Sequence, residues 1–121
     1  MLKHNLQFVK IKYLKDAKRE IKKIGSDPKS INIMAPKAIT KVIKIENVML
    51  QDAIIIKQDM LSLGGEVATP KNTFELYDKT AEILIIGNLK QLYELVKKLK
   101  RHYTRIKNIA NELSTLIKEV K

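Results

Sequence analysis

The chain has 121 residues, of which 45% are hydrophobic, and this size and composition fit one soluble domain with little room for two. Lysine and arginine number 24 against 13 acidic residues, which gives a formal net charge of +11. Cysteine is absent, which excludes a disulfide framework, a thiol nucleophile and a cysteine-ligated metal. The only histidines, His4 and His102, lie far apart with no ligand cluster around either, so we expect no metal and no cofactor.

No apolar run approaches the roughly 20 residues that a bilayer-spanning helix needs. The first residues also lack the apolar core of a signal peptide. The sequence therefore predicts a cytoplasmic protein that makes no membrane contact.

The first half of the chain predicts a strand, a helix and a second strand. Apolar residues alternate with lysines over residues 6–14, which predicts a strand. Residues 15–24 carry an apolar stripe at helical spacing opposite a lysine-rich side, and Gly25 follows as a natural helix end. Residues 26–36 have turn chemistry and a proline, whereas residues 37–46 are rich in β-branched side chains and predict the second strand.

The middle of the chain predicts a helix and two further strands. Apolar spacing over residues 49–63 is helical, and Gly64-Gly65 directly afterwards suits a helix end. Residues 66–69 predict a short strand, and residues 71–80 a polar loop. Residues 81–86 are nearly continuous in apolar character, which predicts the central strand of the sheet.

The last 34 residues, 88–121, contain no glycine or proline and predict one long helix that Asn88 can cap. At 1.5 Å per residue this helix would measure about 50 Å, more than a domain of roughly 30 Å, so its second half must project, bend back or find a partner. Its apolar residues alternate at spacings of 4 and 3, the repeat of a coiled-coil seam, which predicts a homo-oligomer. The alternative is a helix that folds back on its own sheet. The seam comprises Leu92, Val96, Leu99, Tyr103, Ile106, Ala110, Leu113, Ile117 and Val120.

Together these elements predict an α+β fold in the order β-α-β-α-β-β-α. We expect a sheet of about four strands, antiparallel or mixed, with two shorter helices and one long C-terminal helix. Residues 1–101 form the expected domain, and residues 102–121 extend the last helix as an interaction segment.

Catalytic signatures are scarce. No nucleotide-binding loop and no nucleophile elbow is present. The carboxylates Asp52, Asp59 and Glu66 are candidates to meet in space, but residues on a helix and the following turn are more often solvated. Catalysis by this chain is therefore not the favoured expectation.

Four stretches, residues 45–48, 51–68, 83–92 and 95–100, resemble the N-terminal extension that some bacterial and archaeal dihydropteroate synthases carry ahead of their catalytic barrel. The likeness rests on an Ala-x-Ile-x-Lys-Gln helix that ends in Gly-Gly, then an apolar strand and a leucine-rich helix. The barrel and its Asn-x-Thr-Pro-Asp-Ser-Phe strand have no counterpart here, so no catalytic residue carries over. The resemblance implies folate or methanopterin biosynthesis and a separate synthase-like subunit as partner.

Polar residues beside the Gly-Gly turn are the candidates for contact with a ligand or partner, with a solvated helix face and a structural turn as the alternative. They are Lys57, Gln58, Asp59, Gly64, Gly65 and Glu66.

A basic patch in the last helix raises nucleic-acid binding as an alternative function. Aromatic residues make up only 5% of the chain, and no RNA-recognition or helix-turn-helix signature is present, which favours a solvated surface. The favoured function is a non-catalytic accessory or oligomerisation protein of pterin biosynthesis; a second alternative is a small pterin-pathway enzyme with a site at an oligomer interface. The patch consists of Lys97, Lys98, Lys100, Arg101, Arg105 and Lys107.

Overall fold

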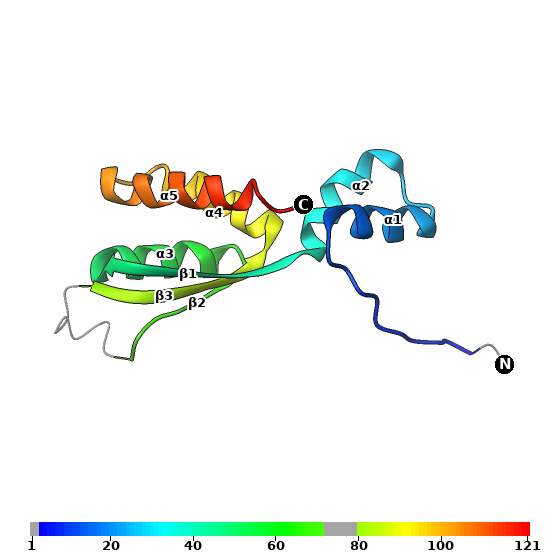
Figure 1. The fold of residues 1–121 in the computed structure, drawn as a ribbon, viewed down its shortest axis with the longest axis horizontal. Coiled ribbons are helices and arrows are strands. Elements are labelled where there is room, and N and C mark those ends of the chain that lie inside the picture. Colours follow the sequence, from blue (N-terminus) through cyan, green and yellow to red (C-terminus); the bar gives the residue numbers. More distant parts are fainter. Residues whose placement is uncertain (1–2, 72–79) are drawn as a thin grey trace.

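The computed structural model describes residues 3–71 and 80–121, which form a three-stranded antiparallel sheet, five α-helices and a short 3₁₀ helix (Figure 1). The elements in chain order are α1 (Leu14–Ile24), α2 (Pro28–Met34), η1 (Ala35–Ala38), β1 (Thr40–Met49), α3 (Leu50–Ser62), β2 (Glu66–Ala68), β3 (Thr80–Asn88), α4 (Leu89–Leu99) and α5 (Thr104–Ile117). None of the helices in these described ranges is long and apolar enough to cross a membrane.

The sheet has the order β1-β3-β2, so β3 is its central strand, as residues 81–86 predicted. Figure 1 shows α3, α4 and α5 on one side of this sheet, and no described helix covers the opposite side. The alternation along β3 agrees with this arrangement: Ile83 and Ile85 are buried, whereas Leu84 and Ile86 on the other face are half-buried. The core therefore lies between one face of the sheet and three helices.

Several elements follow the sequence prediction closely, because their ends carry specific signals. Helix α1 ends at Gly25, which has a φ of 87° and so takes the left-handed conformation that a glycine allows. Helix α4 begins with the predicted cap: Asn88 Oδ1 accepts the Gln91 N–H at 2.8 Å, and Gln91 Oε1 accepts the Asn88 N–H at 2.9 Å. The turn predicted near residue 27 is the start of α2, where the Asp27 carboxylate accepts the Lys29 N–H and Pro28 takes the first helical position.

The predicted strand over residues 6–14 is wrong. Residues 3–12 form an extended arm that joins no sheet, so the described sheet has three strands and not about four. Leu6 and Phe8 are fully exposed on this arm, at 91% and 104%. Alternation indicates that a segment suits a strand, but it does not supply an edge for that strand to pair with.

The predicted single C-terminal helix is also wrong. The chain leaves the helix after α4 and returns as α5, which packs beside α4 over the sheet (Figure 1). The described part of the chain therefore has five α-helices where three were expected, and the second half of the predicted helix is folded back on the chain's own sheet. Burial explains the reversal, because a projecting helix would leave its apolar stripe in water. Seven seam residues are buried inside the chain: Leu92, Val96, Leu99, Ile106, Ala110, Leu113 and Ile117.

The three helices α1, α2 and η1 form a small group beyond one end of the sheet (Figure 1). Two backbone hydrogen bonds join this group to the main body. The Leu14 N–H donates to the Lys121 carbonyl at 2.7 Å, and the Leu89 N–H donates to the Ile39 carbonyl at 2.8 Å. The start of α1 thus lies beside the end of the described chain.

Helix α3 approaches the sheet closely at Met60, which is fully buried. The Met60 side chain lies against Gly65 and Gly87, and a Cβ atom at either glycine would collide with it. These two glycines therefore make room for α3 against the sheet, which adds a packing reason for Gly65 beyond the turn itself.

Candidate functional site

A row of polar contacts ties α3 to the turn between α4 and α5. Asp52 and Asp59 are seven residues apart on α3, which places them on one face of that helix. Asp52 contacts Tyr103 and Arg105, and Asp59 contacts His102. We call these five residues the anchor cluster.

The inner half of the anchor cluster surrounds the carboxylate of Asp52, whose side chain is only 1% exposed. Arg105 donates from Nε to Oδ2 at 2.5 Å and from Nη2 to Oδ1 at 3.0 Å. The Tyr103 hydroxyl donates to Oδ1, and Arg105 also lies over the Tyr103 ring at 5.1 Å from its centroid. This two-point guanidinium–carboxylate geometry is the strong form of an ion pair.

The electrostatics of this group favour an ionised Asp52. Burial alone would raise its pKa, but the hydrogen bonds from Arg105 and Tyr103 outweigh burial and hold the pKa of Asp52 below its usual value. The pKa of Tyr103 is raised by burial and by its hydrogen bond to the Asp52 carboxylate. Both carboxylate oxygens are occupied by donors, so the group stabilises the turn as it stands and would have to release a donor before it could act as a base.

The remaining contact of the anchor cluster, between Asp59 and His102, holds the same turn against the C-terminal half of α3. His102 Nε2 lies 2.9 Å from Asp59 Oδ2. Beside it, the Lys98 ammonium donates to Ser62 Oγ at 2.7 Å. The chain therefore reverses direction where two of its side chains, His102 and Tyr103, are fixed to α3.

The six residues predicted for ligand or partner contact fall into separate groups. Lys57 donates from Nζ to the Val67 carbonyl at 2.7 Å and lies 3.5 Å from Glu66 Oε1. Glu66 accepts the Val67 N–H, which is the main reason that its pKa is lowered. Gly64 and Gly65 form the turn between Lys57 and Glu66, with Gly64 at a φ of 87°.

The other two predicted residues are not part of that turn. Asp59 points to His102 across the opposite side of α3. Gln58 is exposed on α3. The structure thus brings four of the six residues together, in a turn where Lys57 and Glu66 hold the start of β2.

The predicted basic patch surrounds the α4–α5 turn. Lys98 and Arg105 are occupied by Ser62 and Asp52. The remaining four side chains are exposed and make no ion pair with any described residue: Lys97, Lys100, Arg101 and Lys107. We call these four the basic turn.

Sequence reasoning did not find the anchor cluster. Tyr103 occupied a position in the apolar repeat, Arg105 belonged to the basic patch, and Asp52 was expected in solvent. Asp52 is separated from Arg105 by 53 positions, and only the chain reversal after α4 brings them together. No local pattern marks such a pairing. Within the described ranges, no group of three histidine or carboxylate side chains is placed to hold a metal ion.

Comparison with known proteins relates the chain to one pterin-pathway enzyme. No family model matches the chain, and no solved structure matches it. The chain is 29% identical over 104 residues to the bifunctional dihydropteroate synthase/dihydropteroate reductase of Helicobacter pylori. The match covers 86% of this chain but only 27% of that enzyme, so the chain spans about a quarter of its relative's length. The expected relation to dihydropteroate synthases is confirmed at this level, as that of a distant relative.

Proposed function

We propose that the chain is a non-catalytic accessory module of pterin biosynthesis that acts by engaging a separate synthase-like subunit. The observation that carries this proposal is the 104-residue match, which takes in most of this chain and about a quarter of a two-activity pterin enzyme. The finer assignment to the N-terminal extension of such synthases rests on the order of the Gly-Gly helix, the apolar strand and the leucine-rich helix.

The geometry of the polar groups supports a structural rather than a chemical role for them. The anchor cluster neutralises Asp52 internally, and Lys57 and Glu66 hold the start of β2. Every buried side-chain nitrogen or oxygen in the described ranges has a hydrogen-bond partner, so the structure presents no buried polar group aimed at a missing ligand.

A pull-down from native cell lysate tests the proposal. The full chain, immobilised, is incubated with lysate before and after nuclease treatment, and bound proteins are identified by mass spectrometry. We expect a dihydropteroate synthase-like protein that remains bound after nuclease. Recovery of ribosomal or other nucleic-acid-associated proteins that disappear after nuclease would contradict the proposal and favour the nucleic-acid alternative.

A variant pair tests where the partner binds. Gln58 is the exposed member of the predicted contact set, and Gln51 is an exposed glutamine two turns earlier on the same helix. We expect Gln58→Arg to reduce recovery of the synthase-like protein severalfold and Gln51→Arg to leave it unchanged. Equal recovery with both variants would remove Gln58 from the contact.

A ligand titration tests the second alternative, a small pterin-pathway enzyme. The purified chain is titrated with dihydropteroate while intrinsic tyrosine fluorescence is recorded, and the mixture is assayed for pterin turnover. We expect no turnover by the chain alone. Turnover that survives in the absence of any second protein would overturn the non-catalytic assignment.

A further inference from the structure

A hollow of about 410 Å³ lies where three segments that are distant in the sequence meet. Its lining comes from the residues just before α1, from the start of β1, and from the end of α5 with the residues after it. The volume lies within the range of about 300–1,000 Å³ that is typical of small-molecule sites. We call it the junction hollow, lined by residues 12–13, 41–43, 116–117 and 119–121.

Apolar and aromatic side chains form part of this lining. Val42, at 58% exposed, and Leu116, at 46%, leave apolar surface open to water. Ile43 and Val120 are half-buried, and the Tyr13 ring is 38% exposed. A ligand with an apolar body would cover these side chains and remove their surface from water.

Three lysines, one from each segment, also line the junction hollow: Lys12, Lys41 and Lys121. None of them forms an ion pair with a described residue. Glu119 is the one acidic side chain among the residues that line the hollow. Cations therefore outnumber carboxylates there, and the resulting positive potential attracts an anion.

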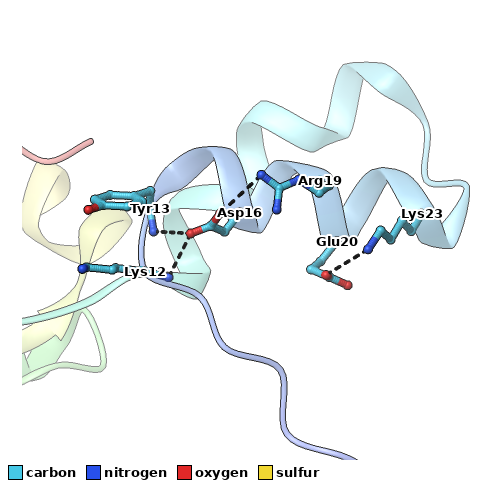
Figure 2. A network of polar contacts seen from close by, with 6 residues as sticks. All are labelled: Lys12, Tyr13, Asp16, Arg19, Glu20 and Lys23. Carbon is cyan, nitrogen blue, oxygen red and sulfur yellow. Dashed lines mark hydrogen bonds and ion pairs between the residues drawn. The ribbon is translucent and has the colours of Figure 1, made fainter.

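Asp16 holds Lys12 and Tyr13 in place without forming an ion pair with Lys12. Its Oδ2 accepts the Tyr13 N–H at 2.8 Å and the Lys12 N–H at 3.2 Å, and Oδ1 lies 3.5 Å from Arg19 Nη2. Figure 2 shows the side chains of Lys12 and Tyr13 side by side, pointing away from α1. The ammonium groups of Lys12 and Lys15 lie 5.4 and 5.5 Å from the centroid of the Tyr13 ring. The ring and the nearby positive charges are thus presented together.

A neighbouring hollow along β1 differs from the junction hollow in charge. It measures about 390 Å³ and shares part of the apolar lining. Its charged residues are Lys44, Glu46 and Glu112, and Lys44 lies 3.2 Å from Glu82 in an ion pair. The two hollows therefore have similar volumes but opposite charge preferences.

From these observations we infer that the junction hollow binds a small organic anion with a flat apolar body. The body covers Ile43 and Val120 and lies against the Tyr13 ring. The anionic head, a carboxylate, sulfonate or phosphate, lies among the ammonium groups of Lys12, Lys41 and Lys121. This binding is independent of the proposed synthase-like partner.

Fluorescence titration of the full chain with 1-anilinonaphthalene-8-sulfonate, an aromatic anion, tests this site. Lys12→Glu with Lys41→Glu reverses two charges of the hollow, and Lys97→Glu with Lys100→Glu reverses two exposed charges of the basic turn. We expect the first pair to raise the Kd of the dye about tenfold and the second to leave it nearly unchanged, with unchanged circular dichroism in both. Equal weakening by the two pairs, or no saturable binding to the wild type, would overturn the inference.

Amide NMR spectra of the full chain test where the dye binds. We expect its addition to shift the amide signals of residues 12–13, 41–43 and 116–121. Shifts confined to the neighbouring hollow at Glu46 and Glu112, or to residues distant from both, would overturn the assignment. Dye binding that disappears as the chains associate at higher concentration would show that a second copy fills the hollow, and would overturn it as well.

A neutral dye tests the charge preference. N-phenyl-1-naphthylamine has the same ring system without the sulfonate, so it should cover the apolar lining but leave the lysines without a partner. We expect it to bind about tenfold more weakly than the anionic dye. Equal affinities of the two dyes would show an apolar hollow with no preference for anions and would overturn the inference.

Discussion

Asp52 lies completely buried near the start of α3, and its two oxygens accept hydrogen bonds from Tyr103 in the α4–α5 turn and from Arg105 just after it. The sequence predicts a solvated carboxylate at this position, because a helical aspartate without a nearby cation gives no sign of burial. Its cation is Arg105, which a continuous helix would have carried away from α3. The hydrogen-bond partners of a side chain were therefore predictable only where the two residues are close in sequence, as in the helix cap formed by Asn88.

Asp52→Asn should destabilise the fold by about 1–3 kcal/mol at neutral pH, because the amide cannot accept both guanidinium hydrogen bonds. The destabilisation caused by Asp52→Asn should become smaller at acidic pH. Since the folded pKa of Asp52 lies below its ordinary value of 3.8, its ionised form stabilises the fold above that value and ceases to do so as the pH falls through the folded pKa. Urea unfolding of both proteins at pH 7 and at pH 3 measures the difference.

Glu20→Gln is the matched control, because Glu20 forms an exposed ion pair with Lys23 one turn later on α1. Pairs of this kind contribute little, so the control should unfold like the wild type at both pH values. An Asp52→Asn protein that also unfolds like the wild type at neutral pH would show that the buried ion pair does not stabilise the turn.

For the helices and strands, the apolar patterns predicted which faces would be buried, but not which other helix or strand would cover each face. The positions of α1, α3 and β3 followed from periodicity and from Gly25, Gly64 and Asn88 at their ends. The reversal at residues 100–103 has no glycine or proline, and helix propensity favoured continuing. The gain from burying Ile106, Ala110 and Leu113 on the sheet exceeds the cost of a few broken helical hydrogen bonds.

Two alanine substitutions on α5 distinguish a docked helix from a projecting one. Ile106 is fully buried and Leu116 is 46% exposed on the same helix. With α5 packed on α4 and the sheet, Ile106→Ala should cost about 2–4 kcal/mol and Leu116→Ala less than about 1 kcal/mol. Denaturant unfolding at a low protein concentration measures both. Equal, small effects would mean that α5 does not pack as described.

For the whole molecule, the net charge of +11 has no single location. Lysines of α1 and the arm carry part of it, and the basic turn carries another part. The composition predicted the excess of positive charge and its attraction for phosphates. How that charge is distributed over the surface depends on where the chain reverses direction. The pterin-pathway relation came from a resemblance over separate stretches, which charge and periodicity do not supply.

Binding of duplex DNA should therefore be weak, indifferent to base sequence and strongly dependent on salt. If the four cations of the basic turn contact phosphates, affinity should fall about a hundredfold between about 50 and 200 mM salt. Fluorescence anisotropy with two duplexes of different sequence measures both properties. Tight binding to one sequence that persists at the higher salt concentration would contradict this expectation and favour a specific nucleic-acid function.

The close packing of Met60 against Gly65 and Gly87 has a consequence for oxidative damage. The thioether is fully buried in the folded chain and packed against both glycines, so a polar sulfoxide oxygen would disturb this contact. Oxidation at this position should require an opening event and then prevent the chain from closing again. Met34 and Met49, which are partly exposed, should oxidise earlier and leave the fold intact. Because oxidation competes with reclosing, the rate at which the Met60 sulfoxide accumulates in peptide mass spectra reports the fraction of chains in which α3 has left the sheet.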